Sequence, residues 1–260
     1  MTNSIMKNKV ILPHIKALKT ILSIVVILTL WELISLIIND SFFMPSVHET
    51  AISLFKIIVS GEFFKVIFIA FFRVISGLIL GIALGISVAY LCHKFDLVNT
   101  LLSPIISIMK ATPVACIIVL LWIRLNYTEI AIFVVVLMVL PIVWQNVYDA
   151  FKNVDKDLVE VADVFKLSKA QRLKALIVPT VLTYLLPATI TSIGLAWKAE
   201  IAAEIMTNSN IGQLIYDFKT VSYDTASIFA WTVIIVTFSI VFEKIAKHFL
   251  GRLTNELKAQ

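Results

Sequence analysis

Apolar runs long enough to cross a lipid bilayer recur along the whole chain. A spanning helix needs about 20 predominantly apolar residues, and runs near that length lie at 21–38, 68–91, 101–125, 130–147, 176–197 and 227–242. Hydrophobic residues make up 60% of the chain and charged residues only 15%, against about half and a quarter in soluble domains. The sequence therefore predicts an all-α, polytopic membrane protein with about six transmembrane helices.

Basic residues are distributed unevenly between the segments that connect these runs. If the N-terminus is cytoplasmic, six of the 22 Lys and Arg residues lie outside or in the outer half of the membrane. These six are Lys56, Lys65, Arg73, Arg124, Lys198 and Lys219. The other sixteen lie inside, and cytoplasmic loops carry such an excess. We therefore expect a multi-pass protein of the cell membrane with both termini in the cytoplasm.

The same pattern gives the expected organisation of the chain. We expect a cytoplasmic segment at 1–19, a transmembrane domain at 20–248 and a cytoplasmic tail at 249–260. Between the first two runs, a helical stripe around Ala51, Leu54, Phe55 and Ile58 predicts an interfacial amphipathic helix on the outer side. The net charge of +5 then reflects contact with membrane lipid and topology, and it does not call for nucleic acid.

A polar stretch at 149–174 separates two of the apolar runs and is too long for an unstructured connection. Its apolar residues Leu158, Val161, Ala162 and Phe165 follow helical spacing. Ser168 then begins a second short helix, because Ser168-x-x-Gln171 has the form of a capping box. The pattern predicts helix, turn, helix outside the membrane; the alternative is an amphipathic loop lying on lipid headgroups.

This stretch resembles the EAA loop of binding-protein-dependent ABC importer permeases. The resemblance rests on Glu160, Val161, Ala162, Asp163, Val164, Phe165, Lys166, Leu167 and Ser168, followed by Ile177, Val178 and Pro179. Lys166 occupies the family's glycine position, where a left-handed backbone would strain a lysine. Segments 73–77, 194–198 and 203–204 resemble the nitrate/sulfonate/taurine branch of these permeases.

The resemblance implies a type I ABC importer permease fold with cytoplasmic coupling helices. In the family, the residues matching 160–163 and 165–168 dock onto an ATPase subunit. Two permease chains, here expected to form a homodimer, pair around a central pathway. Two ABC ATPase subunits carry the ATP and Mg, and an extracytoplasmic binding protein delivers the substrate. The branch implies a small anion such as a sulfonate, taurine or nitrate.

The chain has no catalytic pattern of its own. None of its seven glycines opens a phosphate-binding loop, so ATP hydrolysis is expected on a separate partner. No paired carboxylates, nucleophile motif or metal-ligand spacing stands out, and no metal or cofactor is expected on this chain. Cys92 and Cys116 lie in apolar segments and suggest inert thiols.

Two sets of residues within the apolar runs are candidates for packing and transport. Gly77, Gly81 and Gly85 recur at four-residue spacing, which in lipid predicts a close-packing seam within the bundle or at a dimer contact; the alternative is a run of tolerated glycines. Ionisable residues at membrane depth are costly and are therefore functional candidates. The candidate pathway residues are Arg73, Trp197, Lys198, Glu200 and Glu204.

Each pathway candidate has an alternative role. Arg73 faces the pathway or extends to the interface, and Trp197 is an interfacial anchor or a gate, with the anchor favoured. Lys198, Glu200 and Glu204 are expected in one polar turn after the fifth span, with Lys198 mainly paired to the glutamates. For the whole chain, an ion-gradient-driven secondary transporter and a membrane enzyme or scaffold are the alternatives.

Overall fold

Helices alone make up the regular structure in the part of the chain that the structure describes. The computed structural model describes residues 13–259, with side chains described for 18–252, so residues 1–12 of the expected N-terminal segment and residue 260 lie outside it. The elements are α1 (Pro13–Ile38), α2 (Val47–Val59), α3 (Phe63–Lys94), α4 (Asp96–Ala111), α5 (Val114–Trp122), α6 (Tyr127–Lys152), α7 (Lys156–Val164), α8 (Lys169–Arg172), the π-helical turn η1 (Leu173–Ile177), α9 (Val178–Met206), α10 (Ile211–Thr220) and α11 (Thr225–Ala259).

Five helical segments are long and apolar enough to cross a membrane. They lie in α1, α3, α6, the continuous segment of α8, η1 and α9, and α11. A sixth crossing arises if α4 and α5 form one broken span, because these helices are bent by 99° at Thr112 and Pro113. The break follows from Pro113, which disfavours helical backbone at the residue before it. The predicted all-α fold with about six spans is confirmed.

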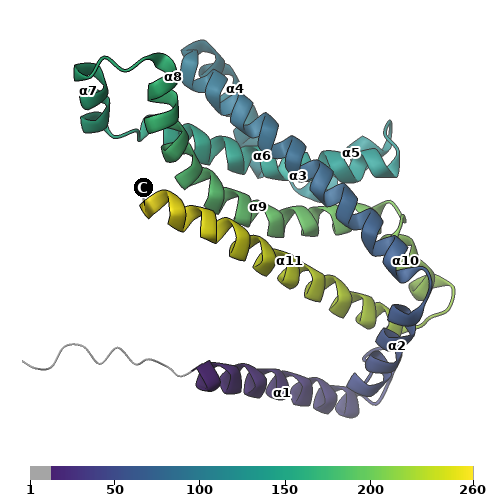
Figure 1. The fold of residues 1–260 in the computed structure, drawn as a ribbon. Coiled ribbons are helices and arrows are strands. Elements are labelled where there is room, and N and C mark those ends of the chain that lie inside the picture. Colours follow the sequence, from purple (N-terminus) through teal and green to yellow (C-terminus); the bar gives the residue numbers. More distant parts are fainter. Residues whose placement is uncertain (1–12, 260) are drawn as a thin grey trace, which may run out of the picture.

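Helix α6 lies at the centre of the bundle, between α3 and α9 (Figure 1). Helix α11 packs along α9 and also contacts α2. In Figure 1, α7, the C-terminal end of α11 and the start of α1 lie at one end of the molecule, and α2 and α10 lie at the other. This arrangement agrees with spans that alternate in direction.

The contact between α3 and α6 is close because three glycines of α3 face valines of α6. A Cβ added to Gly77 would lie 2.5 Å from Val135 Cβ. The corresponding distances are 2.8 Å from Gly81 to Val139 and 2.7 Å from Gly85 to Val143. Real side chains do not approach this closely, so only glycine permits the observed separation of the two helices.

Helix α1 lies apart from the bundle and is held mainly through its C-terminal half. Its apolar stretch Leu18–Ile38 is almost wholly exposed. The Trp31 indole N–H donates to the Pro45 carbonyl at 2.9 Å, and the Ser35 hydroxyl donates to the Met44 carbonyl at 2.9 Å. The Glu32 carboxylate accepts the Val47 N–H at 2.8 Å. These bonds fix the turn between α1 and α2.

The expected helix around 51–58 is present as α2. Ser46 and Glu49 form a complete capping box at its start. The apolar stripe faces outward, with Phe55 68% exposed, while Thr50, Ser53 and Ile57 form the buried face. An outward apolar stripe suits a helix that lies against lipid.

Helix α9 runs farther than the sequence analysis expected, and this corrects the end of the fifth span. The predicted span ended at Trp197, with a polar turn after it, whereas the helix continues to Met206. Glu200 and Glu204 therefore lie within a helix and are fully buried. The intervening alanines favour helix, and Arg73 supplies a compensating charge to the buried carboxylates.

Candidate functional site

The 153–172 loop contains two short helices, each with a side-chain cap. Asp155 accepts the Asp157 N–H at 2.9 Å and begins α7. The Ser168 hydroxyl accepts the Gln171 N–H at 3.3 Å, and the Gln171 side chain accepts the Ser168 N–H at 2.8 Å. The capping box predicted from the sequence is confirmed. The loop extends beyond the ends of the spanning helices (Figure 1).

The turn between α7 and α8 has the geometry that usually requires glycine. Lys166 adopts a left-handed conformation with φ of 51°. The Leu167 N–H donates to the Ala162 carbonyl at 3.0 Å, and the Lys166 N–H donates to the Asp163 carbonyl at 3.0 Å. Arg172 reinforces the turn with an ion pair to Asp163 at 2.5 Å. Lys166 therefore preserves the turn despite its strain.

The exposed surface of this loop combines apolar and acidic side chains. Ala162 is buried, whereas Val164 and Phe165 are 78% and 74% exposed. Val161 is half-exposed, and Glu160 beside it is exposed. Exposed large apolar side chains on a polar loop are typical of a protein interface.

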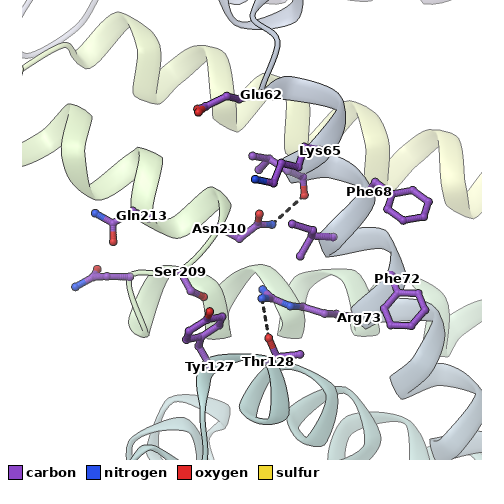
Figure 2. A pocket seen from close by; sticks show the side chains of 13 residues that line it. Glu62, Lys65, Phe68, Phe72, Arg73, Tyr127, Thr128, Ser209, Asn210 and Gln213 are labelled. Carbon is purple, nitrogen blue, oxygen red and sulfur yellow. Dashed lines mark hydrogen bonds between the residues drawn. The ribbon is translucent and has the colours of Figure 1, made fainter.

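A second group of predicted residues forms a buried ion cluster near the start of α6 and the C-terminal end of α9. Arg73 Nη1 lies 2.6 Å from Glu204 Oε1 and 4.0 Å from Glu200 Oε1, and all three side chains are at least 95% buried. Arg73 Nη2 donates to the Thr128 hydroxyl at 3.0 Å (Figure 2). The Arg73 guanidinium also lies 5.6 Å from the centre of the Tyr127 ring. The cluster joins α3, α6 and α9.

Glu204 also fixes the loop that follows α9. Its carboxylate accepts from the Asn210 side chain at 2.8 Å and from the Ile211 N–H at 3.0 Å. Asn210 reaches on to the Val66 carbonyl of α3 at 2.9 Å (Figure 2). A Cβ at Gly212 would lie 2.0 Å from the Glu204 carbonyl oxygen. Only glycine allows α10 to begin this close to α9.

The structure corrects two expectations about the pathway residues. Lys198 does not pair with Glu200 or Glu204; it is exposed on another face of α9, and Arg73 takes its place. Trp197 is no interfacial anchor, because it is 1% exposed, donates to the Ile235 carbonyl at 3.2 Å and stacks near Phe238 of α11. Positions 197 and 198 point differently because successive helix residues are about 100° apart.

A cleft of about 690 Å³ lies over the ion cluster, between α3, the start of α6 and the 208–213 segment. Figure 2 shows Arg73, Tyr127 and Thr128 on one side and Gln213 on the other. Glu62 and Lys65 line the cleft at the N-terminal end of α3, and the side-chain amides of Asn208, Asn210 and Gln213 line it on the side of the 208–213 segment.

No sequence pattern pointed to Thr128, Asn210 or Gly212 as partners of the cluster. Asn210 donates to Glu204, six residues away, and to Val66, 144 residues away. The run Asn208-Ser209-Asn210 consists of residues that are common in turns, and Asn208 and Asn210 both have positive φ. Sequence spacing alone could not have joined that turn to Arg73.

A family model for the inner membrane component of binding-protein-dependent transport systems matches residues 81–255. The chain belongs to this family. The matched region contains the 153–172 loop. The chain is therefore a transport permease component, and its membrane location as a multi-pass protein follows from the family and the apolar spans.

Relatives and solved structures agree with this assignment. The chain is 26% identical over 243 residues to a Bacillus subtilis strain 168 protein named as an aliphatic sulfonates transport permease, SsuC, covering 92% of this chain and 86% of that one. It is 28% identical over 141 residues to the bicarbonate transport system permease protein CmpB of Synechococcus elongatus, covering 54% and 51%.

Two solved transporters share the fold. One is an amino acid ABC transporter with histidines, with a TM-score of 0.58, 15% identity, and coverage of 72% of this chain and 90% of that one. The other is an inward-facing MetNI methionine ABC transporter, with a TM-score of 0.55, 14% identity, and coverage of 75% and 93%. The fold is that of type I ABC importer permeases, and the chain is an ABC importer permease.

Proposed function

We propose that two copies of this chain form the membrane channel of an ATP-driven importer for a small anion. An extracytoplasmic binding protein delivers the anion, and two ATPase subunits bind ATP and Mg beneath the channel. Both termini face the cytoplasm. ATP-driven closure of the ATPases moves the 153–172 loop, here called the coupling loop, and the spans then open alternately to the two sides.

The coupling loop is the observation that carries this proposal. Val164 and Phe165 are more than 70% exposed at the end of α7, on a loop beyond the membrane-spanning helices (Figure 1). Capped helices and the Asp163–Arg172 ion pair keep this surface in one shape. A rigid apolar surface outside lipid suits docking to a second protein, as the EAA-like sequence of the loop also implies.

An anionic substrate is supported by the relatives and by the basic residues of the outer cleft. The two relatives described above are named for aliphatic sulfonates and for bicarbonate, both of which are anions. Lys65 and Arg73 line the outer cleft, together with the amide groups of Asn208 and Gln213. Because Glu204 neutralises Arg73, the amides and Lys65 are the groups that would first meet an arriving anion.

The experiment tests docking and coupling together. Phe165→Asp and Glu160→Lys are compared with wild type after co-expression with the ATPase subunit, by co-purification and by ATPase activity in reconstituted complexes. Phe165→Asp should weaken co-purification because it places a charge in an apolar contact, and Glu160→Lys should separate hydrolysis from uptake.

Val221→Asp is the matched control for this experiment. Val221 is 73% exposed, comparable to Phe165, but it follows α10 at the opposite end of the molecule. It should leave co-purification unchanged. Normal docking and normal substrate-stimulated hydrolysis in both coupling-loop variants would exclude this loop as the ATPase contact.

A further inference from the structure

A groove of about 460 Å³ lies between the C-terminal end of α3, the end of α6, η1 and the first turns of α9. It lies at the end of the molecule from which the coupling loop extends, away from the ion cluster (Figure 1). Val178, Val181 and Leu182 of α9 give it an apolar wall, together with Phe151 of α6. The volume lies within the range of about 300–1,000 Å³ that is typical of small-molecule sites.

Basic side chains line this groove, and no carboxylate does. Lys94 and His93 both line it, and Lys94 forms no hydrogen bond or ion pair with any residue that the structure describes. Asp96 follows Lys94 closely but lies in the first turn of α4, where its charge favours that helix. Asp149 accepts from the Gln145 side chain at 2.9 Å. The groove therefore carries a positive charge that no acidic group within it balances.

Aromatic rings hold the two basic side chains at the mouth of the groove. Lys94 Nζ lies 5.1 Å from the centre of the Phe95 ring and 6.0 Å from that of Tyr90. The His93 ring stacks on Phe151, with their centres 4.8 Å apart. Lys94 is the last residue of α3, and tyrosine is enriched where spanning helices leave the hydrocarbon. The mouth of the groove therefore lies at the level of the lipid headgroups.

The groove changes from basic to apolar as it runs into the membrane. The basic residues lie at the end of α3, whereas the wall of α9 continues from Ile177 to Val181 and Leu182. Val181 is four residues beyond Ile177, or about 6 Å deeper at 1.5 Å per residue. A soluble anion would leave the apolar part unused. An amphiphile with an acidic head and an apolar chain matches both parts in the order in which they occur.

We propose that this groove binds a phospholipid with an anionic headgroup. The phosphate lies at Lys94 and His93, the start of one acyl chain lies along Val181 and Leu182, and the rest of the lipid stays in the bilayer. This inference takes from the proposed function the orientation that places the coupling loop in the cytoplasm. The cytoplasmic leaflet has a negative surface potential from its anionic lipids, and basic pockets between spanning helices on that side bind such headgroups.

The bound lipid contacts the segment that joins the coupling loop to α9. Leu173 and Ile177 of η1 both line the groove, and the Val178 N–H donates to the Leu173 carbonyl to close the π-helical turn. Turns of this kind occur frequently at functional sites. A lipid between α3 and η1 limits the movement of the base of the coupling loop, so its binding regulates the coupling of this loop to the spans.

The test measures lipid binding to the full-length permease in detergent by native mass spectrometry. Phosphatidylglycerol is compared with phosphatidylcholine of the same acyl chains, and the wild type should bind phosphatidylglycerol more tightly. Lys94→Gln should weaken that binding about fivefold, which corresponds to about 1 kcal/mol for one basic residue at an anionic surface. Lys94→Arg should bind as the wild type does, because it keeps the charge. Equal affinity of the wild type for the two lipids would overturn the proposal.

Lys152→Gln is the matched control for the loss of charge. Lys152 Nζ also lies over an aromatic ring, 4.3 Å from the centre of Tyr148, and Lys152 is the last residue of α6. It does not line the groove, so this variant should bind phosphatidylglycerol as the wild type does. Equal weakening in Lys152→Gln and Lys94→Gln would show general attraction to basic residues and would overturn the site.

Two further measurements separate a lipid from other occupants. Val178→Trp narrows the apolar part at a position that is 42% exposed; it should weaken phosphatidylglycerol binding although Lys94 is intact, and unchanged binding would overturn the site. Glycerol 1-phosphate, which has the head without the chains, should not displace the lipid at equal concentration; displacement would indicate a site for soluble anions. Loss of ATPase co-purification in Lys94→Gln with unchanged lipid binding would assign the groove to a protein contact.

Amide exchange tests the link to the coupling loop without relying on transport. Exchange at 173–178 should slow when phosphatidylglycerol is added near its Kd for the wild type, and it should slow less in Lys94→Gln; equal slowing would overturn the regulatory role. If reconstituted complexes show no ATP-driven uptake while binding depends on Lys94, the importer proposal fails and the lipid site stands. Normal ATP-driven uptake with lipid binding that is independent of Lys94 overturns the lipid site alone.

Discussion

Replacing Glu204 by Gln should destabilise the permease strongly, because Glu204 is the main charge partner of buried Arg73. The Glu204 carboxylate accepts from Arg73 at 2.6 Å, from Asn210 at 2.8 Å and from the Ile211 N–H at 3.0 Å. A glutamine has one acceptor oxygen, so one of these donors faces an amide NH₂. Removing one partner of a buried pair typically costs about 3–5 kcal/mol, and Glu200 at 4.0 Å places the expected cost near the lower end, about 3 kcal/mol.

The decisive assay is a double-mutant cycle with Arg73→Met, read as the melting temperature of the detergent-purified complex. The variant R73M/E204Q removes both members of the ion pair. Its loss of unfolding free energy should therefore be smaller than the sum of the losses in the two single variants by at least about 1 kcal/mol. Asp163→Asn is the control, because its ion pair with Arg172 is exposed and such pairs contribute about 0–1 kcal/mol. Additive losses, or a loss from Glu204→Gln no larger than the control's, would refute the buried-pair reasoning.

Three further predictions concern the packing of α3 on α6, the coupling loop and the cap of α2. Gly81→Leu should lower the free energy of unfolding by about 1–3 kcal/mol, and with it the melting temperature, because the leucine overpacks the contact with α6. Gly61→Leu should leave the melting temperature unchanged, because Gly61 has open space around it. Lys166→Gly should raise the stability of the coupling-loop turn by about 1 kcal/mol, since a left-handed lysine is strained; amide exchange at the end of α7 measures this, and faster exchange would contradict it. The pKa of Glu49 lies below its ordinary value of 4.5. The main cause is the hydrogen bond that its carboxylate accepts from the Ser46 backbone N–H, and the hydroxyls of Ser41 and Ser46 lower the pKa further. The cap on α2 therefore contributes stability above pH 4.5 that is lost as the pH falls through the lowered pKa; amide exchange in α2 should be slow at pH 7 and faster in Glu49→Gln, and equal exchange would exclude the cap.

Local patterns in the sequence predicted the features that depend on neighbouring residues. The Ser168–Gln171 capping box is set within four residues, and each apolar span is set within one continuous run of the sequence. The left-handed Lys166 was harder to foresee, because its strain is offset by two backbone hydrogen bonds and the Arg172 ion pair beside it.

Contacts between distant segments could not be predicted from spacing. Arg73 and Glu204 are 131 residues apart, and no periodicity links them. The expectation that Lys198 would pair with the glutamates assumed a polar turn after Trp197. A continuous helix instead turns Lys198 away from Glu200 and Glu204, and only the packing of α3 against α9 brings in Arg73.

ATP-dependent uptake tests the central claim most directly. Proteoliposomes containing the permease, its ATPase and its binding protein are loaded with ATP and Mg, and hexanesulfonate uptake is measured with no ion gradient. We predict accumulation that stops when ATP, Mg or the binding protein is left out. Uptake that needs a proton or sodium gradient and persists without ATP would contradict the account and would identify an ion-driven secondary transporter.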